Sequence, residues 1–282
     1  MAKKPTTTKS NEPLVIAPLD TGDAHFCILG MSPLIQNRMP EKARQELLFP
    51  RGGKMSSSDK RHHLKHNPLE EFRSAAHAPR GKDYSTRLII PAGSFKKSLI
   101  NATTDTEGAA KTQIIRLTWI LGADGGNDIP VYGVPELVMS VVRMSNQDHT
   151  PDIRTRAILP QWACYLSVRF VKPQLTGQTI ANLLARAGLL IGIGDWRHEK
   201  TGDYGMFRIT SADDPQFLEI VKNGGKEAQE AALEEPNMYD SDTEDLYDFF
   251  GQEFARRERQ PVTKKGSRNS EEEQEELTEV VS

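Results

Sequence analysis

The sequence is poor in cysteine, in aromatic residues and in long apolar runs. Its two cysteines, Cys27 and Cys164, are too few for a disulfide framework, and a structural zinc site would need more ligands at closer spacing. We expect both to be buried free thiols. No run approaches the roughly 18 apolar residues of a membrane span. Residues 1–11 are rich in Lys and Thr and lack the apolar segment of a secretory signal, so we expect a cytoplasmic protein without membrane contact.

Several catalytic fingerprints are also missing. The sequence has no Walker phosphate loop, no serine nucleophile elbow and no dinucleotide-binding glycine motif. His25 and His198 are candidate bases for a metal-independent ribonuclease, but neither has an evident partner in the sequence. One further ionisable cluster lacks the spacing of a zinc site; it comprises Asp59, His62, His63 and His66. We therefore predict no cofactor, no metal and no catalytic residue.

Charge is distributed unevenly along the chain, although the net charge is only −3. Residues 38–116 contain 16 Lys or Arg and 8 Asp or Glu, whereas residues 212–282 contain 8 and 20. A basic front with an acidic tail recurs in nucleic-acid-binding proteins, because the basic part meets phosphates. Charge runs are also common as solvated surfaces, so this pattern favours a nucleic-acid partner without establishing one.

Composition divides the chain into four parts. We predict a disordered N-terminal tail over residues 1–23, a folded domain over 24–211, a helical extension over 212–259 and a disordered acidic tail over 260–282. Within the domain, residues 40–86 have too few apolar side chains to form a core of their own. They are predicted to be a basic insertion that lies on another element, with short helices at 41–48 and 68–76.

The hydrophobic pattern of the domain predicts alternating strands and helices. Strands are expected at 25–30, 87–91, 113–121, 129–132 and 136–144, and one long extended run at 157–171. Helices are expected at 92–102 and at 176–187, where Gly188 would end the second. Residues 189–192 and 205–209 would flank a glycine loop, and helices near 217–221, 227–233 and 243–259 would follow. This order predicts an α+β fold with an elaborated ferredoxin-like (RRM-like) β-α-β-β-α-β core.

A candidate phosphate site lies at the start of the helix predicted from residue 92. Gly93 and Ser94 would leave backbone N–H groups free at the helix start, and Lys96 and Lys97 would add positive charge. An ordinary capped helix with solvated lysines would give the same pattern. The candidate contacts here are Ser94, Lys96 and Lys97.

The glycine loop is a second candidate. Its glycines permit close approach of the backbone to a ligand, its basic residues suit phosphates, and its aromatic residues suit base stacking. A long β-hairpin with packed aromatic side chains is the alternative interpretation. The candidate contacts in this loop are Gly192, Gly194, Trp196, Arg197, Lys200 and Tyr204.

A third basic element precedes the extended run that begins at Ala157. Arg154 and Arg156 alternate, so both face one side of an extended chain. With Arg143 and Arg169 they would continue a positive groove across the sheet. Paired surface arginines explain the same pattern equally well.

Three segments, in this order, resemble the RAMP superfamily, whose members form the backbone of CRISPR effector complexes. Residues 29–34 (LGMSPL) resemble the end of the family's first strand, and residues 90–99 (IPAGSFKKSL) its I-P-G-S-S-L-K-G helix motif. Residues 192–207 resemble its glycine-rich loop with Gly-aromatic-Gly. The resemblance spans about residues 24–209 but is continuous only within the motifs. Ala92 and Lys97 depart from the family's glycines, and the loop between Gly194 and Gly202 is longer and more acidic.

The resemblance implies a protein that coats single-stranded RNA or DNA through the phosphate backbone as a homo-oligomer, with the insertion reaching a neighbour. Some RAMP backbone subunits cut RNA with an acidic residue after the first strand, and Asp59 and Asp83 lie in that region without a matching motif. An endoribonuclease is therefore one alternative. The chain also resembles proteins of tailed phages, which implies a phage structural or assembly protein as another, or a solitary phage-encoded RAMP member. The acidic tail would bind a protein partner or occupy the basic groove itself.

Overall fold

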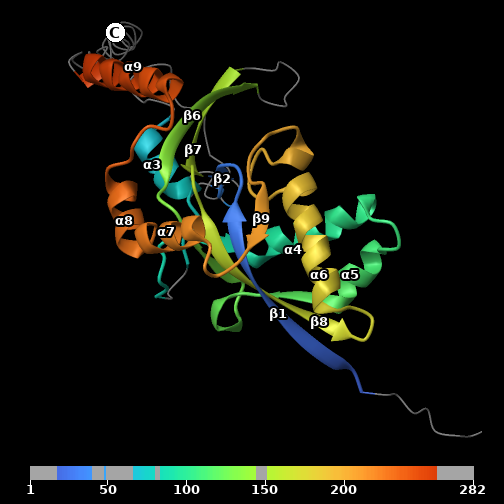
Figure 1. Ribbon diagram of the computed structural model, residues 1–282. Coiled ribbons are helices and arrows are strands. Elements are labelled where there is room, and N and C mark those ends of the chain that lie inside the picture. Colours follow the sequence, from blue (N-terminus) through green and yellow to red (C-terminus); the bar gives the residue numbers. More distant parts are fainter. Residues whose placement is uncertain (1–17, 40–47, 49–65, 80–82, 144–150, 259–282) are drawn as a thin grey trace, which may run out of the picture.

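The fold combines antiparallel strands and helices. The computed structural model describes residues 18–39, 48, 66–79, 83–143 and 151–258, and Figure 1 shows them coloured along the chain. Every pairing between the named strands is antiparallel. The predicted α+β class is therefore confirmed.

A main sheet of six strands has the order β3-β5-β8-β1-β9, and β4 pairs with β8 as well. The strands β4 and β5 follow one another along the same edge of β8, because β4 pairs with residues 167–170 and β5 with residues 163 and 164. The strands of the main sheet are β1 (Asp20–Gly30), β3 (Ile89–Pro91), β4 (Thr118–Leu121), β5 (Asp128–Tyr132), β8 (Ala163–Lys172) and β9 (Phe207–Thr210).

A smaller sheet of three strands has β7 at its centre, in the order β2-β7-β6. The strands β6 and β7 pair along their whole length and form a ribbon that extends from the body of the molecule (Figure 1). The short strand β2 follows β1 closely in the chain and so connects the two sheets. The bounds are Leu34–Gln36 for β2, Glu136–Arg143 for β6 and Pro151–Leu159 for β7.

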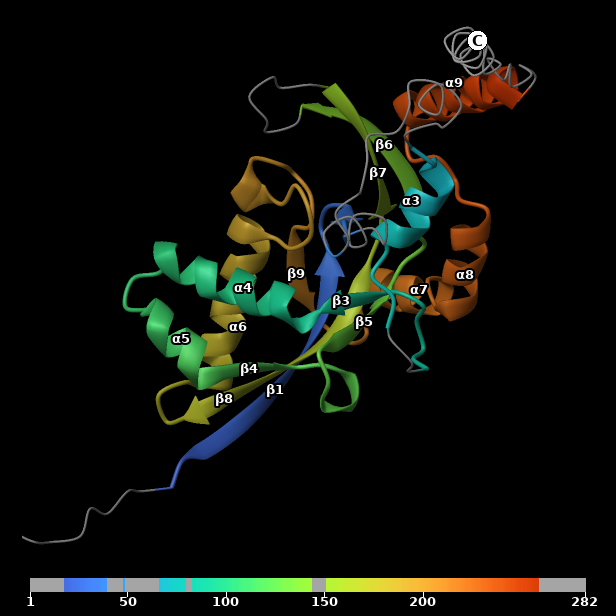
Figure 2. The same cartoon turned by 180° about the vertical axis from the view of Figure 1, so that it is seen from behind.

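Helices cover both faces of the main sheet (Figures 1 and 2). Alternate side chains of β1 separate the two faces: Phe26 and Ile28 join the core beneath α4 and α6, whereas Leu29 packs with Phe217 of α7. In the small sheet, α3 lies against β7 and α9 against β6. The helices are α3 (Pro68–Ala75), α4 (Ala92–Ala102), α5 (Lys111–Leu117), α6 (Gly177–Arg186), α7 (Pro215–Asn223), α8 (Lys226–Glu234) and α9 (Ser241–Glu258).

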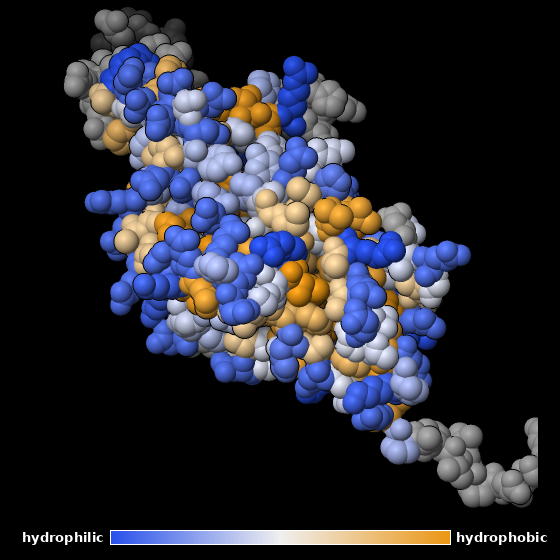
Figure 3. Space-filling model, in the orientation of Figure 1, coloured by the Kyte–Doolittle hydropathy of each residue, from blue (hydrophilic) through white to orange (hydrophobic). Residues whose placement is uncertain are grey.

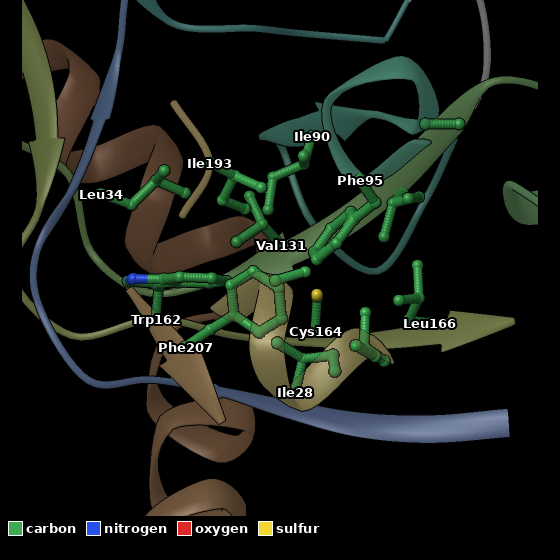
Figure 4. Packing of buried hydrophobic residues seen from close by; sticks show 14 of the residues in the cluster. Ile28, Leu34, Ile90, Phe95, Val131, Trp162, Cys164, Leu166, Ile193 and Phe207 are labelled. Carbon is green, nitrogen blue, oxygen red and sulfur yellow. The ribbon is translucent and has the colours of Figure 1, made fainter. Parts of the chain in front are cut away.

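The main core centres on large rings between the sheet and α4. Figure 4 shows Phe95, Trp162 and Phe207 among aliphatic side chains. The Phe207 ring meets the other two edge to face, with centroids 5.4 Å from Phe95 and 6.3 Å from Trp162. The buried indole satisfies its only donor, because Trp162 Nε1 donates to the carbonyl of Ser32 at 2.9 Å.

The helical extension is tied to the sheet through one buried amide. Gln229 of α8 donates through Nε2 to the carbonyls of Val131 and Gly133 at 2.8 and 2.9 Å. Its Oε1 accepts from the backbone N–H groups of Arg87 and Leu88. Because each bond satisfies a buried backbone group, the amide fixes α8 against β5 and the residues that precede β3.

Two predicted strands are wrong in part. The extended run at 157–171 is broken at Pro160, so β7 and β8 belong to different sheets, and buried Trp162 occupies the bend. Residues 113–117, predicted as the start of a strand, form most of α5 instead. The Thr118 hydroxyl donates to the carbonyl of Ile114 at 2.6 Å, which helps to end this helix before β4 begins.

The helix predicted at 176–187 begins as expected, because Thr176 Oγ1 accepts from the N–H of Thr179. It does not end at Gly188. A π-helical turn, η3 (Ala187–Ile191), continues it, so residues 189–191 are not strand. A Cβ on Gly188 would lie 2.0 Å from the carbonyl oxygen of Phe207, so glycine here allows close packing of η3 on β9.

The helices predicted at 68–76 and 92–102, and the three after residue 212, are all present. The disordered tail predicted at 1–23 is wrong at its end, because residues 20–23 begin β1 and pair with β8. The rest of both tails lies outside the described residues, apart from residues 18 and 19, as do the helix at 41–48, apart from Leu48, and most of the insertion. In the part of the chain that the structure describes, no helix is long and apolar enough to cross a membrane. On the face that Figure 3 shows, hydrophilic residues cover most of the surface and hydrophobic residues are exposed near its middle.

Candidate nucleic-acid interface

The three sequence motifs lie side by side in the folded chain. The N–H of Met31 donates to the carbonyl of Met206 at 2.8 Å, and the N–H of Asp195 donates to the carbonyl of Ile35 at 3.0 Å. These bonds join the end of the first strand to the glycine loop. Ser94, in the first turn of α4, lines the same pocket of about 150 Å³ as Gly194. The helix motif therefore completes the cluster.

A groove of about 850 Å³ lies between the β6-β7 ribbon, α3 and the glycine loop. We call it the arginine groove, because four arginines from three segments line it. Its apolar wall comes from Val141, Val142 and Ile153. Asn37 lines both the groove and the smaller pocket, so the two are neighbours. The residues that define the arginine groove are Arg38, His66, Arg143, Arg154, Arg156 and Trp196.

The groove follows from the unequal lengths of β2 and β7. The strand β2 pairs only with residues 157–159 of β7. Residues 151–156 pair with β6 on one side, and among the described strands they have no neighbour on the other. Arg154 and Arg156 lie opposite Ser140 and Val138, so they share one face of the ribbon as their alternation predicts.

Arg156 and Trp196 form the inner end of the groove. Arg156 Nε lies 2.8 Å from Asp195 Oδ2, and the same carboxylate oxygen accepts from Asn37 Nδ2 at 2.9 Å. The guanidinium carbon of Arg156 lies 5.0 Å from the centre of the Trp196 ring. Tyr204 lies beyond Trp196, with ring centroids 6.4 Å apart. Arg156 is therefore paired and holds the indole in place, while 39% of Trp196 remains exposed to solvent.

Arg154 differs from Arg156 in exposure and in pairing. Half of its side chain is exposed, and its guanidinium lies 3.4 Å from Asp152 Oδ2. The contact is long for an ion pair and half of the arginine stays in solvent, so its guanidinium can also meet a phosphate beside the buried Asp152. Arg143 lies on the neighbouring strand and is also exposed. These two arginines are the groove residues best placed to meet an anion.

His66 links α3 to β7 at the edge of the groove. Its Nδ1 lies 2.7 Å from Glu71 Oε1 and its Nε2 lies 3.1 Å from Asp152 Oδ1. Both ring nitrogens thus face carboxylates, which leaves neither available to a metal or a substrate in this arrangement. The described residues contain no group of three His, Cys, Asp or Glu side chains arranged to hold a metal. Asp59, His62 and His63 lie outside them.

The smaller pocket contains the predicted phosphate site at α4. No described side chain caps the N-terminus of α4, and its first turn has no acidic residue. The N–H of Ala92 donates to the carbonyl of Asn127 at 2.7 Å, so the N–H groups of Gly93 and Ser94 are the ones in this turn that favour an anion. Ser94 lies in this turn and lines the pocket, and Asp195 lines it as well.

Lys96 is not the surface cation that the sequence suggested. Its Nζ donates to the carbonyls of Ile114 and Ile115 at 3.1 Å each, to the Thr118 carbonyl and, at 2.7 Å, to Thr118 Oγ1. Ile114 and Ile115 lie in the last turn of α5, so the ammonium caps this helix at the point where β4 begins. Burial lowers the pKa of Lys96. Lys97 is exposed and does not line the groove.

Arg197 and Lys200 also lie away from the groove lining. Arg197 donates through Nε and a terminal nitrogen to Glu199 Oε2 at 2.9 and 2.7 Å, and Asn101 of α4 donates to the other oxygen of that carboxylate at 2.8 Å. Arg197 therefore fixes the loop to α4. Lys200 is exposed on the surface. The structure gathers Arg154, Arg156 and Trp196 but not the two lysines of α4 or Arg197.

Two further residues of the sequence analysis have other partners. Arg169, expected to extend the positive groove, donates to both carboxylate oxygens of Asp23 at 2.8 Å, within the main sheet. Asp83, considered as a catalytic acid, lies 2.7 Å from Lys226 Nζ. That hydrogen bond lowers the pKa of Asp83. Both residues hold neighbouring elements together.

The loop glycines allow close approach to the protein's own backbone. Gly194 has φ +83°, and a Cβ on it would lie 2.6 Å from Leu34 Cδ1 and 2.7 Å from the Ile35 oxygen. Gly192 has φ +73°, and its Cβ would lie 3.0 Å from the Gly205 oxygen. The sequence predicted that a ligand would contact these two glycines. In the structure, β2 lies against Gly194, and the other side of the loop lies against Gly192.

Sequence reasoning missed four residues that shape the groove: Asn37, Arg38, Asp152 and Asp195. Arg38 and Asn37 follow directly after the first motif, and Asp195 lies inside the third. Proximity to the motifs was therefore a usable signal for these three. Asp152 has no such signal, because its partner His66 is 86 residues away.

No protein-family model matches the sequence, and a search of curated proteins finds no match. Among solved structures, the chain is similar to one chain in a cryo-EM structure of the Type III-B Cmr-beta complex bound to cognate target RNA. The TM-score is 0.36 at 10% identity, over 68% of this chain and 59% of that one. It is also similar to Cmr6 from Pyrococcus furiosus, with a TM-score of 0.30 at 12% identity, over 68% of this chain and 100% of that one. Both similarities are distant.

Proposed function

We propose that this chain is a single-stranded nucleic-acid-binding protein of the RAMP type and that the arginine groove is its binding site. The observation that carries the proposal is the convergence of four arginines and one exposed tryptophan in a single groove. The three motifs that resemble the RAMP family meet beside that groove. Arginine suits phosphates because its charge is permanent and its donors form a planar fork.

The strand order supports an elaborated ferredoxin-like core. Across the main sheet, β9, β1, β8 and β4 are neighbours, with α4 between β1 and β4 in the chain and α6 between β8 and β9. This is a β-α-β-β-α-β sequence with the first strand beside the third and fourth. In this interpretation, β2, β6 and β7 form an insertion of their own that carries the groove.

The groove favours a single strand over a duplex. Trp196 offers a ring face for stacking, and only an unpaired base can use it. Arg38, Arg143 and Arg154 would bind phosphates on either side of that base, and the uncapped start of α4 would bind another beyond Asn37. Phosphate and stacking contacts carry little sequence information, so we infer non-specific binding that RNA and DNA share.

We further propose that binding occurs without catalysis and that several copies coat one strand. An endoribonuclease is the alternative for the groove, and it requires that bound RNA displaces one of the two carboxylates that His66 faces. Incubation of labelled single-stranded RNA with and without a divalent metal separates the two functions. Intact RNA supports a binding protein. Cleavage that His66→Ala abolishes would replace the proposal with a nuclease, and an absence of any binding would favour a phage assembly role.

The groove itself is tested by matched arginine variants in an anisotropy titration with a single-stranded oligonucleotide at several salt concentrations. Arg154→Ala should weaken binding to unrelated sequences alike and reduce the salt slope by about 0.7 per lost phosphate contact. Arg169→Ala is the control, because its side chain is as exposed (46% against 50%) but lies outside the groove. Equal effects of the two variants, or parent affinity that does not depend on salt, would overturn the proposal.

A further inference from the structure

One wall of the arginine groove is the edge of β7 that no described strand covers. The backbone N–H and C=O groups of a strand point to alternate sides from one residue to the next. Leu137 lies opposite Ala157, and its N–H donates to the carbonyl of Asn237 at 2.9 Å, away from β7. Ala157 therefore directs its own groups away from β6, towards β2. Thr155 and Ile153 point the same way, towards the groove that both line.

This edge has no partner because β2 stops early. The strand β2 ends at Gln36, so Arg38, which would lie opposite Thr155, does not pair with it. The N–H of Arg38 donates instead to the carbonyl of Ala75 at 2.9 Å. Among the described residues, no backbone bond reaches the outward groups of Thr155 or Ile153. The Thr155 hydroxyl also lacks a partner there, although Thr155 is only 7% exposed.

Polar groups without partners in a buried place are costly, so a ligand that supplies partners is favoured here. An N–H beside a C=O matches the Watson–Crick edge of an unpaired base, where a donor stands beside an acceptor. A peptide strand can also bind an open edge. This edge suits a peptide poorly, because only Ile153 and Thr155 offer both groups: Pro151, the other outward residue, has no N–H.

The edge lies among the groups already assigned to the strand. Trp196 lines the same groove as Ile153 and Thr155. Arg154 stands between these two in the sequence of β7 and is half exposed. One groove thus offers a guanidinium for a phosphate, a ring face for the plane of a base and main-chain groups for the edge of a base.

We propose that the main chain of β7 at Ile153 and Thr155 binds the Watson–Crick edge of an unpaired base in the bound strand. The inference rests on the proposed nucleic-acid-binding function and adds the part of the ligand that phosphate and stacking contacts leave unassigned. Every base presents both a donor and an acceptor on this edge, so the contact selects unpaired bases without selecting a sequence. A duplex is excluded, because its base edges are already bonded to each other.

A methylated strand tests the contact without altering the protein. Anisotropy titrations compare a labelled strand of thymidines with a strand of equal length made of N3-methylthymidine. The two strands carry the same charge and the same ring, but the methyl group replaces the donor of the base edge. The protein should bind the methylated strand roughly 3- to 10-fold more weakly, the effect of one hydrogen bond, with an unchanged salt slope.

Proline variants locate the contact on β7. Ile153→Pro and Thr155→Pro each replace an outward N–H by a ring that keeps the base from the neighbouring carbonyl, and a strand edge tolerates proline where the N–H faces outward. Both should bind the thymidine strand more weakly and lose most of the discrimination between the two strands.

Thr21→Pro is the matched control on the open edge of β1. The N–H of Gly30 donates to the Trp162 carbonyl on the β8 side, so alternation directs the N–H of Thr21 to the other side. No described strand lies opposite Thr21 on that side, and Thr21 does not line the groove. This variant should retain both the affinity and the discrimination.

Circular dichroism shows whether each variant folds, and the methylated strand decides alone where a proline variant does not. Equal affinity of the parent for the two strands, with a normal salt slope, overturns this inference and leaves the groove as a site for phosphates and stacking. Proline variants that fold and keep the full discrimination also overturn it. An absence of binding to either strand overturns the proposed function as well, so the two failures are distinguishable.

Discussion

The guanidinium of Arg156 lies over the ring of Trp196, with its carbon 5.0 Å from the ring centre. The two residues come from different segments, Arg156 from β7 and Trp196 from the glycine loop. Asp195 lies 2.8 Å from Arg156 Nε, so the charge is paired, while 39% of Trp196 stays exposed. We therefore expect Trp196 to stack on a base of the bound strand, and we expect Arg156 to contribute less as a direct contact to phosphate.

The first prediction concerns this ring. Trp196→Ala should weaken binding of single strands by about 5- to 150-fold, because stacking contributes about 1–3 kcal/mol per base. The salt slope should stay unchanged, since no phosphate contact is lost. Trp196→Phe should retain most of the affinity. Anisotropy titrations at two salt concentrations measure both quantities.

Trp119→Ala is the matched control for that prediction. Trp119 is 46% exposed, against 39% for Trp196, and lies on β4 of the main sheet outside the groove. Its replacement should leave affinity unchanged. A loss as large as that of the Trp196 variant, or a reduced salt slope for Trp196→Ala, would contradict the stacking role.

The second prediction separates two neighbouring lysines. Lys96→Met removes the donor that caps α5, so several carbonyls lose their partner, and we expect a loss of about 1–3 kcal/mol in the free energy of unfolding. Lys97→Met changes an exposed side chain and should shift that free energy by less than about 0.5 kcal/mol. Urea unfolding measures both. Equal stability of the two variants would show that Lys96 is not a structural cap.

Sequence patterns correctly predicted the helices and strands whose positions depend mainly on the residues within them. The helix α4 lies at the predicted residues, because apolar spacing and Pro91 both mark it. The strand interpretation of residues 113–117 failed because Ile114, Ile115 and Leu117 suit either structure, and the cap that favours the helix comes from Lys96. A residue that caps from a distance leaves no local signal. The π-helical turn after Arg186 brings Gly188 close to Phe207, which is distant in the sequence and leaves no local signal either.

The candidate site was likewise predictable from the sequence only in part. Alternation placed Arg154 and Arg156 on one face, and the structure agrees. Composition could not separate Arg154, which is half exposed, from Arg197, which is bound to Glu199. Each arginine has a carboxylate two residues away, Asp152 for Arg154 and Glu199 for Arg197, so the difference depends on how the fold orients and buries these side chains. Basic residues are therefore recognisable from sequence, but their free or paired state is a property of the fold.

The third prediction is a pH dependence. Asp214 caps α7, and the hydrogen bond from the Thr210 hydroxyl, with further bonds from the Phe217 N–H and from Arg208, lowers its pKa from 3.8 to about 2. The folded pKa is below the unfolded one, so the ionised carboxylate stabilises the fold above pH 3.8. That contribution is lost as the pH falls towards 2.

Asp214→Asn tests this dependence, because asparagine still caps a helix but does not titrate. The parent should be more stable than the variant at neutral pH, and the difference should shrink as the pH falls and vanish near pH 2. Thermal unfolding over a pH series measures it. A difference between parent and variant that stays constant across this range would mean that the carboxylate does not contribute through its charge.

The last prediction tests whether the glycine loop owes its shape to contact with β2. Gly194 has φ +83°, which disfavours any residue with a Cβ, and that Cβ would lie 2.7 Å from the Ile35 oxygen. Gly194→Ala should therefore cost about 1–3 kcal/mol in the free energy of unfolding. It should also weaken nucleic-acid binding, because Asp195 and Trp196 follow directly and would shift with the loop. Gly177→Ala is the control: it lies in the first turn of α6 with open space around it, and alanine there should be neutral or slightly stabilising. If Gly194→Ala lowered stability but left affinity intact, the loop would be a structural support and the arginines alone would account for binding.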